Sequence, residues 1–93
     1  MQLASTAAPA TGGRTNERRA DARLVTLAAE CATRLDRVCA DWSRTRRMDL
    51  AFEVAFGKLR GEMPPDEWAT LRSRYERHRQ EFDSRLVARA AAD

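Results

Sequence analysis

Residues 24–63 read LVTLAAECATRLDRVCADWSRTRRMDLAFEVAFGKLRGEM, and apolar side chains recur through them at alternating spacings of three and four residues. Ten of the twelve positions in this series are apolar. The series consists of Leu24, Ala28, Cys31, Leu35, Val38, Trp42, Thr45, Asp49, Phe52, Phe56, Leu59 and Met63. Residues at this spacing share one face of an α-helix, so the series predicts helices that pack along an apolar seam.

The series fails only at Thr45 and Asp49, beside the basic residues of the segment 44–47. A straight α-helix drifts by ~20° per heptad from a seven-residue repeat, so an unbroken helix over the whole series would have to supercoil. We therefore favour a break at residues 43–47, where Ser43 or Thr45 could cap a new helix. The alternative is one continuous helix.

Helix start and stop signals predict helices at about 16–43, 47–61 and 65–91. Asn16 is a permitted N-cap, Gly61 ends the second helix, and consecutive prolines suit the start of the third. The apolar face of the third helix contains Trp68, Leu71, Tyr75, His78, Phe82 and Leu86. We predict an all-α fold, either a small three-helix bundle or a helical hairpin.

Residues 1–15, MQLASTAAPATGGRT, contain no acidic residue and no apolar run long enough for a signal peptide. We predict a flexible N-terminal arm at 1–15 and a single helical domain at 16–93. No segment approaches the ~20 apolar residues of a membrane span. Cys31 and Cys39 lie too far apart on one helix to form a disulfide, which suits a reducing compartment and a cytoplasmic location.

The predicted domain has few large apolar side chains. A single core in a chain of this size rarely contributes more than about 3–5 kcal/mol of stability. We therefore expect a protein partner or a homo-oligomer, and the alternative is a marginally stable monomer.

The sequence gives little indication of catalysis. Its single histidine, His78, falls on the predicted core face, and neither a glycine-rich phosphate loop nor a metal-ligand spacing occurs. We predict no enzymatic activity, no catalytic residue, no cofactor, no metal and no small-molecule substrate.

The main functional prediction is a non-enzymatic protein-interaction module, acting as an adaptor, regulator or inhibitor. Interfaces favour aromatic residues and arginine. The candidate partner or packing residues are Leu35, Trp42, Phe52, Phe56, Leu59, Trp68, Tyr75 and Phe82. The alternative is that these apolar stripes meet only each other inside one chain.

A second functional prediction is a small Arg-rich subunit that contacts the phosphates of DNA or RNA. Arg44, Arg46, Arg47 and Lys58 would form a basic stripe if they lay along one exposed helix face. No helix-turn-helix, zinc-finger or basic-zipper pattern accompanies them. The alternative is that these side chains only solvate a helix.

Lys58-Leu59, Met63-Pro64 and Trp68 occur at spacings similar to those at the end of the Hha-type nucleoid-associated regulators. These are small helical proteins that partner a DNA-binding protein. The similar window covers eleven residues, and the preceding helices differ from that family in length and register. No residue role is carried over from it.

Overall fold

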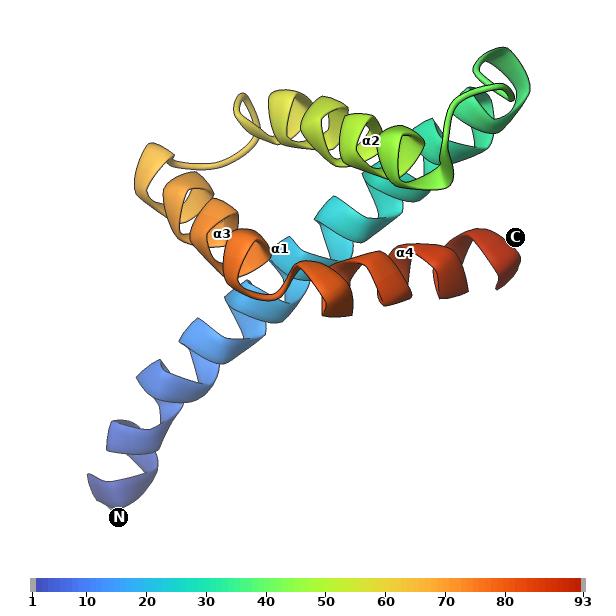
Figure 1. The fold of residues 1–93 in the computed structure, drawn as a ribbon. Coiled ribbons are helices and arrows are strands. Elements are labelled where there is room, and N and C mark those ends of the chain that lie inside the picture. Colours follow the sequence, from blue (N-terminus) through green and yellow to red (C-terminus); the bar gives the residue numbers. More distant parts are fainter. Residues whose placement is uncertain (1, 93) are drawn as a thin grey trace.

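The computed structural model describes the backbone of residues 2–92 and the side chains of residues 16–92. Within this range the chain forms four α-helices and no strand. They are α1 (Gln2–Val38), α2 (Arg44–Leu59), α3 (Pro65–Arg77) and α4 (Arg79–Ala92) (Figure 1). The predicted all-α fold is therefore confirmed.

The long helix α1 runs diagonally through the fold, and α2 and α4 pack against its second half (Figure 1). The α3 helix connects α2 to α4 and makes fewer contacts with α1 than either of these helices does. The molecule measures 59 × 26 × 21 Å. Its long dimension is close to the roughly 55 Å expected for a helix of the length of α1, so this helix determines the shape.

The core lies where α1, α2, α3 and α4 meet, and all four helices contribute buried side chains. An aromatic cluster forms its centre, with the ring centroids of Phe52 and Tyr75 4.8 Å apart and those of Phe56 and Tyr75 5.2 Å apart. The buried apolar residues are Leu24, Val25, Leu27, Ala28, Ala29, Ala32, Ala51, Phe52, Ala55, Phe56, Leu59, Leu71, Tyr75, Phe82 and Leu86. Because α1 is covered by two helices, it buries Val25 and Leu27 as well as members of the predicted series.

The predicted break in the long apolar series is confirmed. The α1 helix ends at Val38, and α2 begins at Arg44 with Ser43 as its N-cap. Of the two predicted caps, Ser43 fills this role. The second helix is therefore shifted from 47–61 to Arg44–Leu59, and the first ends before its predicted limit at 43.

The backbone of α1 continues back to Gln2, so Asn16 does not begin the helix. The side chains of residues 1–15 lie outside the described part of the structure. The flexible arm predicted for these residues stays a prediction, as does the single domain at 16–93.

The prediction of one continuous helix at 65–91 is wrong, because the chain bends at His78. In a straight helix, Tyr75 and Phe82 would be separated by about 10 Å along the axis. The bend brings their ring centroids within 5.7 Å and lets both rings pack on Phe52. His78 itself is exposed at the bend and does not join the core face on which the sequence placed it.

Candidate functional site

The chain turns from α1 into α2 through a short, hydrogen-bonded connection. The N–H of Cys39 donates to the carbonyl of Leu35 at 2.7 Å, and the N–H of Trp42 donates to the carbonyl of Cys39 at 2.9 Å. The Ser43 hydroxyl then accepts from the N–H of Arg46 at 3.2 Å. A serine at this position satisfies one of the N–H groups that a helix leaves unpaired at its start. We call residues 34–47 the corner.

The Arg47 side chain fastens the corner from the α2 side. Its Nη1 donates to the carbonyls of Cys39 and Ala40, each at 3.3 Å, and to the carbonyl of Trp42. Its Nε donates to Asp36 at 3.1 Å. The carbonyls after a helix end lack helical partners, and a cation there is favoured by the helix dipole. Arg47 therefore holds the connection in one conformation.

The corner exposes apolar surface together with guanidinium groups. Within residues 16–92, Val38 is the large apolar side chain that the fold leaves exposed, at 80%. Trp42 is half-buried, and the Arg46 guanidinium lies 3.9 Å from its ring centroid, within the range of a cation–π interaction. Aromatic residues and arginine beside an exposed aliphatic side chain are typical of the surfaces that bind other proteins.

The excess positive charge of the chain is concentrated in the corner. Residues 34–47 contain five arginines and two aspartates, a net charge of +3 that equals the net charge of the whole chain. Outside the corner, the remaining twelve basic residues match twelve acidic residues. Several of those arginines pair with carboxylates of other segments of the fold, in the ion pairs Arg23–Glu62, Arg72–Glu53, Arg74–Asp21 and Arg79–Asp49.

A hollow of about 280 Å³ opens beside the corner, between the end of α1, the start of α2 and the end of α4. Its walls are largely apolar, and its charged groups are Asp36, Arg44 and Arg47. The residues that line it are Ala32, Asp36, Arg44, Arg47, Met48, Leu86, Val87, Ala90 and Ala91. The α4 wall was not predicted from the sequence, in which the small residues Ala90 and Ala91 were the available signal.

The structure does not place the predicted nucleic-acid residues along one exposed face. Arg44 and Arg46 are exposed at the start of α2, whereas Arg47 is engaged in the corner and its side chain is only 19% exposed. Lys58 is exposed near the other end of α2. Between these ends, the face that Arg47 and Lys58 share contains Ala51 and Ala55, both fully buried.

Most of the predicted partner residues belong to the core of this chain. Phe52, Phe56, Leu59, Tyr75 and Phe82 are buried, and the half-buried Leu35 and Trp68 pack against the core. The Trp68 indole N–H also donates to the carbonyl of Phe56 at 2.9 Å. Of the eight predicted residues, Trp42 alone lies in the corner outside this cluster. The apolar stripes therefore meet largely within the chain.

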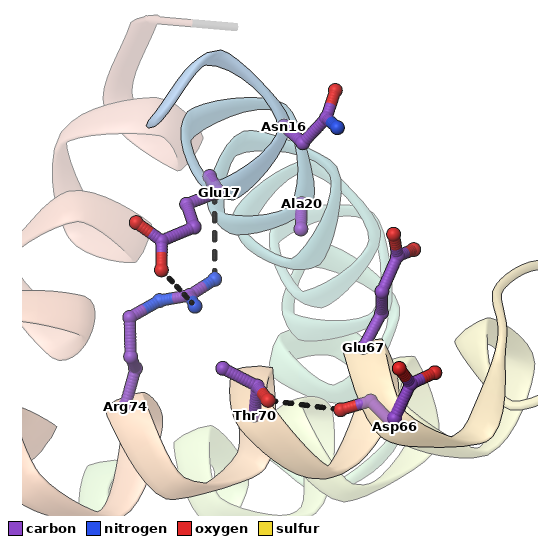
Figure 2. Close-up of a pocket in the computed structure, with 7 residues that line it drawn as sticks. All are labelled: Asn16, Glu17, Ala20, Asp66, Glu67, Thr70 and Arg74. Carbon is purple, nitrogen blue, oxygen red and sulfur yellow. Dashed lines mark hydrogen bonds and ion pairs between the residues drawn. The ribbon is translucent and has the colours of Figure 1, made fainter. Parts of the chain in front are cut away.

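Figure 2 shows a second hollow, of about 240 Å³, between α1 and α3. Its lining residues are Asn16, Glu17, Ala20, Asp66, Glu67, Thr70 and Arg74. Arg74 extends across it to Glu17 at 3.2 Å and also binds Asp21 at 2.8 Å (Figure 2 shows the former). Because Arg74 is already paired and Asp66 and Glu67 lie in the first turn of α3, these charges have structural explanations.

The buried Tyr75 and the half-buried Asp83 have shifted pKa values. Burial raises the pKa of Tyr75 to about 12. Burial also raises the pKa of Asp83, and repulsion by Asp49 adds to the effect while Arg79 opposes it. One Asp83 carboxylate oxygen is buried without a hydrogen-bond partner.

The described residues form no group of three or more His, Cys, Asp or Glu side chains that could hold a metal ion. Both cysteines are free and half-buried. None of the helices in the described range is long and apolar enough to cross a membrane. Comparisons of the chain with protein-family models, with curated proteins and with solved structures found no match.

Proposed function

We propose that this chain is a non-enzymatic protein-interaction module that binds an acidic surface of a partner protein through the corner. It would act as an adaptor, regulator or inhibitor by occupying that surface. The observation that carries the proposal is the coincidence of two features at residues 34–47. The net charge of the chain is concentrated there, and the same segment exposes Val38 and contains the half-buried Trp42.

The rigidity of the corner supports this assignment. Arg47 and Ser43 form hydrogen bonds with the backbone of the connection, which limit the conformations that it can adopt before a partner arrives. A preorganised surface loses less conformational entropy on binding than a flexible one. Charge complementarity would mainly raise the association rate, and the apolar contact at Val38 would contribute to affinity.

The experiment is isolation of the tagged full-length chain from its native host, with and without nuclease, followed by mass and nucleic-acid analysis. The variants are Val38→Ser, which removes the apolar contact, and Arg44→Glu, which reverses one charge. Arg18→Glu makes the same charge reversal at an exposed site on α1 outside the corner. We expect a nuclease-resistant protein partner that is retained by Arg18→Glu and lost from the two corner variants.

Two results would contradict the proposal. One is a partner that Val38→Ser and Arg44→Glu retain as well as the unmodified chain does. The other is retention of nucleic acid alone. Since an acid at a helix N-terminus is favoured by the dipole, Arg44→Glu should fold normally, and loss of binding would not reflect unfolding.

Nucleic-acid binding is the second candidate, because Arg44 and Arg46 are exposed together at one end of α2. It has less support, since Lys58 lies apart from these two arginines. The face of α2 that Lys58 shares with Arg47 is buried at Ala51 and Ala55. Binding to phosphates would weaken steeply as salt rises. Retarded migration of DNA or RNA at low salt, abolished by Arg44→Ala with Arg46→Ala, would favour this candidate.

We further propose a cytoplasmic location. The two half-buried cysteines remain free thiols, which suits a reducing compartment. Fractionation of host cells that express the tagged chain would test this: we expect it in the cytoplasmic fraction, and its recovery elsewhere would contradict the proposal.

A further inference from the structure

We propose that the hollow between α1, α2 and α4 binds one apolar side chain of an acidic amphipathic helix, and that a carboxylate of that helix pairs with Arg44. This inference rests on the proposed function and names the chemistry of the partner. The hollow adjoins the corner and shares Asp36, Arg44 and Arg47 with it. One partner segment could therefore contact both surfaces.

The size and lining of the hollow favour a side chain over a cofactor. Its volume of about 280 Å³ lies just below the range of about 300–1,000 Å³ found for sites that bind small molecules. Met48 on α2 and Val87 on α4 are apolar lining residues from two sides of the hollow, and both are half-buried, so apolar surface remains for a ligand to cover. An apolar side chain that filled this space would gain the free energy of leaving water.

The spacing of the lining residues favours a helix as the occupant. On α4, the residues at the hollow are Leu86, Val87, Ala90 and Ala91, which are neighbours on one helix face. On α2, Arg44 and Met48 are one turn apart and form the opposite wall. Small alanines on the α4 face and Ala32 on α1 leave room beside the α2 residues, and the side chains of a third helix can insert into such a groove.

Charge selects an acidic occupant. Of the two arginines at the hollow, Arg47 is paired with Asp36 and with backbone carbonyls, whereas Arg44 forms no ion pair among the residues whose side chains are described. Arg44 also lies in the first turn of α2, where the helix dipole favours a negative charge. A carboxylate one helical turn from the apolar anchor would bind there.

A second copy of this chain is a poorer occupant on the same grounds. The chain outside the corner contains equal numbers of acidic and basic residues, so its overall charge does not complement the corner. Two corners brought together would repel each other.

The experiment is an NMR titration of the full-length chain with a blocked helical peptide of about 18 residues, which would form about five turns. The peptide contains one Leu with a Glu four residues away. We expect the amide signals of Arg44, Met48, Val87, Ala90 and Ala91 to shift together. Replacing the peptide Leu by Ala, or its Glu by Gln, should weaken binding about tenfold, which corresponds to about 1.4 kcal/mol.

Variants of the chain provide the matched test. Arg44→Glu removes the charge partner, and Ala91→Trp covers the hollow from an exposed position at its lip, so neither alters the core. Both should weaken binding about tenfold, and Arg18→Glu should not. Equal binding to all forms, or no shift at these residues, would overturn the inference.

The two proposals can fail separately. If Val38→Ser loses the native partner while Ala91→Trp and the peptide controls have no effect, the corner binds a partner and the hollow does not. Sedimentation that shows a dimer of the unmodified chain, dissociated by Ala91→Trp, would assign the hollow to a second copy and overturn the acidic helix as its occupant.

Discussion

Arg47 is the residue on which the conformation of the corner depends most, and its replacement by alanine gives a quantitative test. The change removes a charged donor from the carbonyls of Cys39, Ala40 and Trp42 and breaks the ion pair with Asp36. A hydrogen bond to a charged group contributes about 1.5–3 kcal/mol, whereas an exposed ion pair contributes about 0–1 kcal/mol. The Asp36 side chain is 65% exposed, so the carbonyl contacts should dominate.

We therefore expect Arg47→Ala to lower the free energy of unfolding by about 2–3 kcal/mol. In a domain of this size, whose core contributes about 3–5 kcal/mol, such a loss is large. At about 4–8 °C per kcal/mol, the Tm should fall by roughly 8–24 °C. Urea denaturation followed by far-ultraviolet circular dichroism measures the first quantity, and a thermal scan measures the second.

Asp36→Ala is the matched control for Arg47→Ala. It removes the ion pair but leaves the carbonyl contacts of Arg47, so it should cost less than about 1 kcal/mol. If Arg47→Ala were as stable as the unmodified chain, or if Asp36→Ala cost as much as Arg47→Ala, the proposed role of the carbonyl contacts would be refuted.

Three further stability predictions follow from single sites. Asp83→Asn should raise the urea midpoint at neutral pH and give no gain below the ordinary Asp pKa of 3.8. The pKa of Asp83 is raised in the folded state, so the stability of the unmodified chain falls as pH rises through the folded-state pKa. An equal gain at both pH values would contradict this. Gly57→Ala should raise stability by about 0.5–1 kcal/mol, since an added Cβ at this exposed helical position meets no atom within 4 Å; a lower Tm would contradict the prediction. Trp68→Phe should lower stability by about 1 kcal/mol through loss of the indole hydrogen bond to Phe56, and an unchanged urea midpoint would show that this bond contributes nothing.

The elements that could be predicted from sequence are those whose signals are local. The spacing of apolar residues identified the helices, Ser43 was one of two predicted caps of α2, and the prolines at 64 and 65 marked the start of α3. The bend at His78 has no such signal, because neither glycine nor proline occurs there. The bend lets Tyr75 and Phe82 pack on the same ring of Phe52, and that contact depends on the tertiary fold.

The candidate site was predicted only in part, because local signals mark its position in the chain but not its side-chain contacts. The basic run at residues 44–47 and the defect in the apolar series indicated where to look. Whether each arginine is available to a partner depends on where α1 ends. Because the carbonyls after the end of α1 lie next to Arg47, Arg47 binds them, whereas Arg44 stays exposed. The exposure of Val38 and the wall supplied by α4 also follow from how the helices pack.

The central claim is that a partner protein binds at the corner, and site-specific photo-crosslinking tests it most directly. A photoreactive residue is placed at Val38 in the full-length chain and, as a control, at Ala69, which is exposed on α3 away from the corner. Illumination in the native host should give a protein adduct at position 38 that survives nuclease treatment and is absent at position 69. No adduct at position 38, or adducts of equal yield at both positions, would contradict the account.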